Sequence, residues 1–347
     1  MTPLSDSEKF RFYTGDCLSV LNQMDDECVD CIVTSPPYWG MRSYDNDNDE
    51  HEIGNEATFE NYQHHLTAVF AEAKRVLKRD GSLWLNLGDR YVDKALLGMP
   101  WRVAISLMSD GWIMRNDVIW HQMKGTQSAK DRLRDSYEHV FHFVRSKNYY
   151  YDADAIRIKP KLQPVVTDTD IRSSTGVSGK KYRMQIRESH ELTEQEKRNA
   201  EDALNQVLAE IRSGAVNDFR MTIRGKQRAW HSDNVRISGR AKELAERGFY
   251  IMRIHAHGHL PNDVWNIVPE DTWRTDSHCA VYPEALLRIP ILATCPENGI
   301  VLDPFIGTGT TVAAALKLGR RGVGIDLSPH YIRISQERVA NIGTMFV

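Results

Sequence analysis

A chain of 347 residues, 41% hydrophobic and 26% charged, is long enough to bury a large core and to carry an inserted subdomain. No apolar run approaches the roughly 20 residues that a membrane span needs, and the first residues lack a signal-peptide pattern, so we expect a soluble cytoplasmic protein. The net charge of −3 is unevenly distributed. Residues 157–260 hold 20 Lys and Arg against 13 Asp and Glu, whereas the remainder holds 24 against 34.

The first informative segment lies near residue 35. The apolar run Cys28 to Val33 predicts a strand, and the segment Ser35-Pro36-Pro37-Tyr38 follows it. Two prolines in succession fix φ twice and remove two amide donors, which leaves outward-facing carbonyls, a hydroxyl and an aromatic ring. Such a group can hold a flat ring that bears an amine. An ordinary proline-rich turn is the alternative for this segment alone.

The next elements predict an alternating α/β pattern. Apolar residues at helical spacing predict a helix from Phe59 to Leu77, and Ser82 to Leu87 reads as a strand, with Gly81 separating the two. A helix over 100–108 and strands over 112–120 and 139–144 follow. Alternation of this kind predicts a mostly parallel sheet with helices on both faces, which binds ligands beyond the carboxyl ends of its strands.

The basic stretch 157–260 has a different composition. Thr193 to Glu196 is a capping box, and apolar positions up to Ile211 predict a helix behind it. The flanks, 163–187 and 217–240, are polar and rich in Ser, Gly and Arg, so we expect mobile loops that DNA orders. A positive surface attracts a phosphate backbone, although a merely solvated insertion would have the same composition.

The C-terminal part carries the second chemical motif. A helix over 283–292 leads to an apolar strand at Ile300, which runs into the turn Gly307-Thr308-Gly309 and a helix over 312–318. Such glycines let the backbone approach a ligand, and the amides that begin the helix favour an anion. A second strand, 322–326, ends at Asp326. Since Val312 replaces the third glycine of the dinucleotide fingerprint, we expect an adenosine ligand without a pyrophosphate, namely S-adenosylmethionine.

At this point the chain resembles the amino-directed DNA methyltransferases of the β arrangement, and especially those that modify the exocyclic N4 of cytosine. The resemblance covers about residues 11–157 and 261–340. Besides the two motifs, it rests on similar segments at Gly15–Leu18, Asn86–Asp89, Gly98–Arg102, Asp110–Trp112, Ile119–His121, Tyr137–Phe141, Asp263–Trp265 and Tyr282–Leu286.

The resemblance implies a Rossmann-like methyltransferase fold with a circularly permuted motif order, because the tetrapeptide precedes the glycine turn. It also implies three segments: a catalytic half over 1–157, an inserted target-recognition region over 158–260 and a cofactor-binding half over 261–347.

The same resemblance implies the site residues. Ser35 and the Pro36 carbonyl would accept hydrogen bonds from the target amine, with Pro37 keeping the segment rigid and Tyr38 stacking on the base. The base would be flipped out of the duplex to reach them. The residues implied for S-adenosylmethionine are Asp16, Cys17, Asp303, Phe305, Gly307, Gly309, Thr310, Thr311 and Asp326. Asp16 and Asp326 have a competing role as turn or strand-end caps.

Serine at position 35 favours cytosine, because related enzymes that methylate adenine more often carry aspartate there. An adenine-N6 methyltransferase and a catalytically silent DNA-binding protein are the alternatives. Methylation of a ring carbon is disfavoured, since no cysteine follows a proline as that reaction's nucleophile does.

The remaining expectations concern partners and metals. The expected partner is double-stranded DNA in a prokaryotic cell or a phage-infected host, with a separately encoded restriction endonuclease as a possible companion. We expect no metal, although Cys28 with Cys31, and His255, His257 and His259, are candidate ligands. Cys17, Cys279 and Cys295 complete an odd cysteine count that suits a reducing compartment. The sequence gives no oligomeric state.

Overall fold

The computed structural model describes residues 8–40, 53–123, 130–159, 163–226, 239–269, 282–340 and 342. The chain forms two compact units, which are described separately below. The first, here called the catalytic unit, comprises 1–156 and 262–347, and the second, called the inserted unit, comprises Arg157–Pro261. Cys279 and residues 227–238 of one predicted loop lie outside the described residues.

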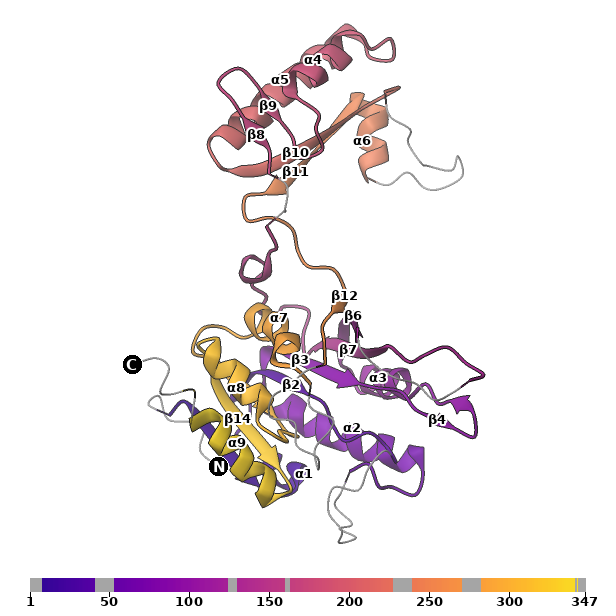
Figure 1. The fold of residues 1–347 in the computed structure, drawn as a ribbon, viewed down its shortest axis with the longest axis vertical. Helices are drawn as coiled ribbons and strands as arrows, with labels where there is room; N and C mark the ends of the chain where they lie inside the picture. Colours follow the sequence, from indigo (N-terminus) through magenta and orange to yellow (C-terminus); the bar gives the residue numbers. More distant parts are fainter. Residues whose placement is uncertain are drawn as a thin grey trace. The chain divides into compact units, whose positions relative to one another are not determined.

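The catalytic unit is built on an eight-stranded sheet (Figure 1). Its spatial order is β1 (Phe10–Thr14), β14 (Arg321–Asp326), β13 (Ile300–Asp303), β2 (Val29–Thr34), β3 (Leu77–Leu87), β7 (Tyr137–Val144), β6 (Ile113–His121) and β12 (Val264–Asn266). Only β7 runs antiparallel to its neighbours. The predicted α/β fold with a mostly parallel sheet is therefore confirmed.

Helices cover both faces of this sheet (Figure 1). One face packs against α1 (Cys17–Leu21), α2 (Phe59–Val76) and α3 (Met99–Ser109), and the other against α7 (Glu284–Thr294), α8 (Thr310–Lys317) and α9 (Pro329–Ala340). The side chains of β2 alternate accordingly, since Ile32 joins the first core whereas Cys31 and Val33 join the second. A strand buried on both faces explains its continuous apolar run.

The strand directions decide where the site lies. β1, β14, β13, β2 and β3 are adjacent and parallel, so their carboxyl ends share one edge of the sheet. Because β7 is antiparallel, its amino end reaches the same edge. A short hairpin of β4 (Tyr91–Val92) and β5 (Ala95–Leu96) follows β3, and a 3-10 turn η1 (Asp154–Ile156) ends the first segment of this unit.

Several predicted boundaries need correction. Gly81 does not separate α2 from the next strand, because β3 begins directly after the helix, at Leu77, and runs through Gly81. The strand pairing jumps there from Val29↔Leu77 to Cys31↔Ser82, so the extra residues form an irregularity within the strand. β1 and the edge strand β12 were not predicted.

In its described residues, the inserted unit combines two antiparallel strand pairs with three helices. Its elements are β8 (Val165–Val166), β9 (Ile171–Arg172), α4 (Gly179–Arg187), α5 (Glu194–Arg212), β10 (Val216–Ile223), α6 (Gly239–Arg247) and β11 (Phe249–His255). β8 pairs with β9, and β10 pairs with β11. The capping box is confirmed, since Thr193 and Glu196 exchange both hydrogen bonds. The prediction of loops over 163–187 and 217–240 is wrong for α4 and β10. Their buried residues, such as Tyr182, Ile186 and Phe219, pack against α5.

Among the described residues, no helix is both long and apolar enough to cross a membrane.

Candidate active site

The tetrapeptide Ser35–Tyr38 leaves the carboxyl end of β2. Pro36 is buried, and the Tyr62 hydroxyl of α2 donates to the Pro37 carbonyl at 3.0 Å. Within the described chain no hydrogen bond is found to the Pro36 carbonyl. The second proline is therefore held by the helix, while the carbonyl that was predicted to accept from an amine is available.

The two polar side chains of the tetrapeptide contact each other. Ser35 Oγ donates to the Tyr38 hydroxyl at 3.2 Å, and Tyr38 donates to Glu138 Oε2 at 2.8 Å. Because the Ser35 proton points to Tyr38, the oxygen lone pairs of Ser35 are free to accept another hydrogen bond. Burial and the neighbouring carboxylate raise the pKa of Tyr38 well above its usual range, so the phenol stays protonated.

The glycine turn connects β13 to α8. Gly307 and Gly309 have φ of 51° and 84°, in the left-handed region. A Cβ on Gly309 would lie 2.9 Å from Ser335 Cα of α9, so this helix packs directly against the turn. Ser335 Oγ also donates to the Gly307 carbonyl at 2.8 Å, and the buried Arg338 donates to Thr310 Oγ1 at 2.9 Å.

Two acidic residues lie beside this turn at the ends of neighbouring strands. Asp326 Oδ2 accepts from the Gly307 amide and Oδ1 from the Ser328 amide, both at 2.9 Å. Asp16 Oδ1 accepts from the Ser19 amide at 2.8 Å and caps α1. The competing role of capping is therefore present at both residues. In the described part of the chain, Asp16 Oδ2 has no hydrogen-bond partner.

Asp303 joins the turn to the tetrapeptide. It is 1% exposed, and its Oδ1 accepts from Thr34 Oγ1 at 2.6 Å and from the Phe305 amide at 3.0 Å. Its Oδ2 accepts from Thr311 Oγ1 at 2.6 Å and from the Tyr282 hydroxyl at 2.9 Å. Burial raises the pKa of Asp303, whereas the donors lower it. Since Thr34 immediately precedes Ser35, one carboxylate holds both functional segments.

The predicted cofactor residues thus fall into two groups. Asp16, Phe305, Gly307, Gly309 and Asp326 lie around the glycine turn and the adjacent strand ends. Cys17, Asp303, Thr310 and Thr311 are buried, and the last three use their polar side-chain atoms on the chain itself. Burial raises the pKa of Cys17 to about 12 and keeps its thiol neutral.

Sequence reasoning missed several residues that build the site. Tyr62 of α2, Tyr282 just before α7 and Glu138 of β7 hold the two loops through their side chains. Glu138 and Tyr282 lie in segments that carry the family resemblance, but nothing local assigns a role to them. The only signal was a polar residue beside the end of a strand.

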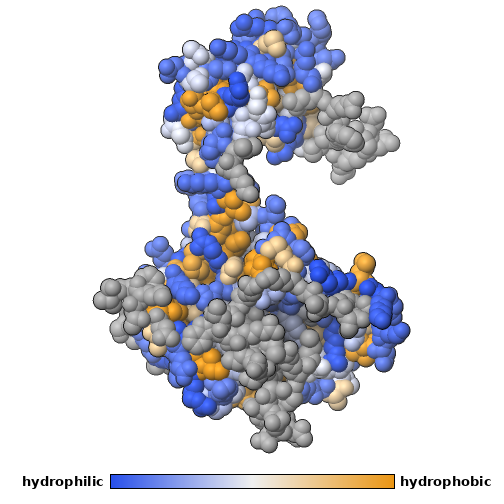
Figure 2. Space-filling model, viewed as in Figure 1, coloured by the Kyte–Doolittle hydropathy of each residue, from blue (hydrophilic) through white to orange (hydrophobic). Residues whose placement is uncertain are grey.

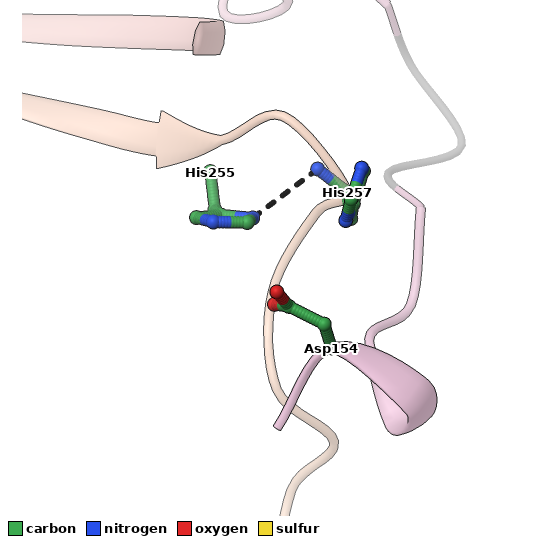
Figure 3. A group of neighbouring side chains, drawn as sticks. All are labelled: Asp154, His255 and His257. Atoms are coloured by element: carbon green, nitrogen blue, oxygen red, sulfur yellow. Dashed lines mark hydrogen bonds between the residues drawn. The ribbon is translucent and has the colours of Figure 1, made fainter. Parts of the chain in front are cut away.

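The histidine set lies in the inserted unit, and all three side chains are exposed. Figure 3 shows His255 at the end of β11, where its Nδ1 accepts from the His257 backbone amide at 3.3 Å. The third labelled residue, Asp154, belongs to η1 of the catalytic unit. Within the inserted unit, His259 pairs with Ile158 through its backbone. The contact of His255 with His257 is thus local, whereas His259 joins two distant parts of the chain through its backbone.

Comparison with known proteins shows the family. The model of the family described as DNA methylase matches residues 29–337. The chain belongs to this DNA methylase family. It is also 30% identical over 386 residues to the type II methyltransferase M.SfiI of Streptomyces fimbriatus, a match that spans 93% of this chain and 89% of M.SfiI.

Solved structures share the fold of this chain. The PvuII DNA methyltransferase, described as cytosine-N4-specific, matches with a TM-score of 0.56 and 15% identity over 95% of this chain and 86% of that chain. TTHA0409 of Thermus thermophilus, a putative DNA modification methylase solved in complex with S-adenosyl-L-methionine, matches with a TM-score of 0.50 and 19% identity, covering 96% and 95%. At these identities the likeness confirms the Rossmann-like methyltransferase fold.

Asp303→Asn tests the link between the two loops. Asparagine carries an NH2 group in place of one carboxylate oxygen. A buried hydroxyl that donated to that oxygen then faces a second donor and loses its acceptor. We expect the free energy of unfolding to fall by about 1–3 kcal/mol, measured by urea denaturation. Asp25→Asn, at an exposed position of the same unit, is the control and should stay within about 0.5 kcal/mol of the parent. Equal stability of Asp303→Asn and the control would contradict the structural role of Asp303.

Proposed function

We propose that this methylase transfers a methyl group from S-adenosylmethionine to the exocyclic N4 of cytosine within a specific sequence of duplex DNA. The observation that carries the proposal is the pairing of β2 with β13, which brings the Ser35–Tyr38 segment beside the glycine turn. Ligand sites of open α/β sheets lie at this edge. Serine in the tetrapeptide, rather than aspartate, supports cytosine as the base.

The residues around the glycine turn fit the cofactor. Thr308 Oγ1 is buried without a partner in the described structure, between two glycines whose φ values lie in the left-handed region. Phe305, Gly307 and Gly309 would line the methionine and ribose part, Asp326 would accept from the ribose hydroxyls, and Asp16 Oδ2 from the adenine amine. When bound, the cofactor supplies an electrophilic methyl group on a sulfonium.

The tetrapeptide acts on the amine. The exocyclic nitrogen is conjugated with its ring and is a weak nucleophile. Hydrogen bonds from its two protons to Ser35 Oγ and the Pro36 carbonyl would hold it in line with the methyl group, and alignment of this kind supplies a large share of catalysis. Tyr38 is fixed by its hydroxyl and presents its ring to the base. The base must leave the duplex to reach this pocket.

We assign target recognition to the inserted unit, which corresponds to the region 158–260 that was predicted for this role. The stretch 157–260 has an excess of positive charge. Figure 2 shows mainly hydrophilic side chains on the drawn face of this unit. Lys180, Lys181 and Arg220 are exposed, and none of them forms an ion pair among the described residues. Unpaired cations are available for phosphates, whose contacts dominate nonspecific affinity.

The relatives support a cellular role. M.SfiI is described as a type II methyltransferase, and we propose that this methylase serves as the protective half of a restriction-modification system. The cutting enzyme would then be a separate protein. We place the methylase in the cytoplasm of a prokaryotic cell or of a phage-infected host, where its DNA substrate lies.

The methylated base tests the proposal directly. The full chain is incubated with labelled S-adenosylmethionine and mixed-sequence duplex DNA, which is then digested to nucleosides and analysed by mass. We expect 4-methylcytosine, and we expect Ser35→Ala to lower the single-turnover rate about 100-fold with unchanged cofactor affinity. Labelled 6-methyladenine would overturn the base assignment, and no label on any DNA would overturn the proposed activity.

Charge neutralisation tests the DNA surface. The double variant Lys180→Gln with Lys181→Gln should weaken binding of all sequences alike and lower the slope of log affinity against log salt by about 2. Lys197→Gln is the matched control, because Lys197 already pairs with Glu194 at 2.9 Å. Fluorescence anisotropy over a salt series measures both quantities. Equal slopes for the double variant and the control would place the DNA elsewhere.

A further inference from the structure

Glu138 has no role in the mechanism so far, although it contacts the tetrapeptide. It is the second residue of β7, and the antiparallel direction of this strand brings it to the edge where β2 and β3 end. Its Oε2 accepts from the Tyr38 hydroxyl at 2.8 Å and from Asn86 Nδ2 at 2.9 Å, and its Oε1 accepts from Gln122 Nε2 at 2.8 Å. Three donors converge on one carboxylate.

These contacts define the state of the carboxyl group. Asn86 Nδ2 and Gln122 Nε2 can only donate, and Tyr38 donates as well, so Glu138 is held as an acceptor. Burial raises the pKa of Glu138 above its usual range, while the three donors lower it. A carboxylate that is partly desolvated but still ionised is a better proton acceptor than one in water.

The packing at Gly88 keeps this carboxylate close to the ring. A Cβ on Gly88 would lie 2.7 Å from Tyr38 Cε2 and 3.4 Å from Glu138 Cδ. Only glycine at the end of β3 lets the tyrosine ring lie against the backbone and reach the carboxylate. The contact between Tyr38 and Glu138 therefore depends on backbone packing at Gly88 as well as on the hydrogen bond between them.

The contacts form a continuous hydrogen-bond chain from Ser35, the proposed acceptor for the amine, to the carboxylate. Ser35 Oγ donates to the Tyr38 hydroxyl, and Tyr38 donates to Glu138. Each hydroxyl can therefore pass one proton on and receive another. The Tyr38 phenol is not itself a base, since its pKa lies well above the usual range.

Resting on the proposed amino methylation, we propose that Glu138 is the final acceptor of the proton that the amine loses. The amine lone pair forms the new N–C bond while the C–S bond breaks and its electron pair stays on sulfur. The nitrogen then passes a proton to Ser35 Oγ, Ser35 passes its own to the Tyr38 oxygen, and Tyr38 passes its own to Glu138. Glu138 ends as a neutral acid and releases its proton to solvent. It touches no substrate atom and is a positioning residue that acts through Tyr38.

The environment gives this role a pH dependence. Among the described residues, the titratable groups that face Glu138 are Tyr38, from the loop after β2, and His139, its neighbour in β7. His139 Nδ1 pairs with Asp117 Oδ1 of β6 at 2.8 Å. The side chains that face Glu138 from β3 and from the end of β6 are the neutral amides. When the pH falls through the raised pKa of Glu138, the acid form cannot take a proton and the rate falls.

The experiment is the single-turnover methylation rate of the full chain as a function of pH, with S-adenosylmethionine affinity measured alongside. We expect Glu138→Gln to lower the rate at neutral pH about 100-fold or more, to remove the acid limb of the profile and to leave cofactor affinity unchanged. Glu138→Asp should restore part of the rate together with the limb. The control is Glu297→Gln, an exposed carboxylate in the turn between α7 and β13.

Tyr38→Phe removes the hydroxyl at the middle of the same hydrogen-bond chain. We expect it to abolish the acid limb too, and we expect the double variant to lose no more than the slower single variant. If Glu138→Gln fails to bind the cofactor, Tyr38→Phe provides the test of the inference. An acid limb that persists in a folded Glu138→Gln or Tyr38→Phe protein would overturn the inference while leaving the proposed function standing. Absence of methylation by the parent protein would instead overturn the proposed function.

Discussion

The pairing of β13 with β2 is the constraint on which the rest of the site depends. Val301 and Leu302 pair with Cys31 and Ile32 in parallel, so two strands from opposite ends of the chain finish side by side. The hydrogen bond from Thr34 to Asp303 closes this junction across 269 positions of sequence. In the proposed mechanism neither segment is complete alone, because one would present the amine-binding groups and the other the cofactor turn.

The strand order explains why the ends of a few neighbouring strands can form the whole candidate site. Parallel neighbours put all their carboxyl ends at one edge, and the single antiparallel strand adds its amino end there. Loops can then carry function, while the buried strands carry stability. The inserted unit leaves the catalytic unit after η1 and returns at β12, so it interrupts neither functional segment.

The sequence predicted the parts whose signal is local. The apolar run of β2, the capping box of α5 and the strand-turn-helix at Gly307 are readable because short-range periodicity and capping chemistry produce them. Predictions failed where pairing or tertiary packing decides. The irregular start of β3 depends on its partner β2, and α4 shows few apolar positions among many charged ones. The site followed the same division: the tetrapeptide and glycine turn were predicted, whereas the Glu138 contact requires β7 to pair in one register.

The central claim is that the two segments form one pocket in which an extruded base meets Ser35 and Pro36. The most direct measurement is a crystal structure of the full chain with a nonreactive S-adenosylmethionine analogue and an unmethylated duplex that contains the recognition sequence. That sequence is identified beforehand from the positions of the methyl groups in DNA that the enzyme has modified. The account predicts a flipped cytosine whose N4 lies within hydrogen-bonding distance of Ser35 Oγ and the Pro36 carbonyl, with the analogue on the Gly307–Gly309 turn. A base that stays stacked in the duplex, or an analogue bound away from this turn, would contradict it.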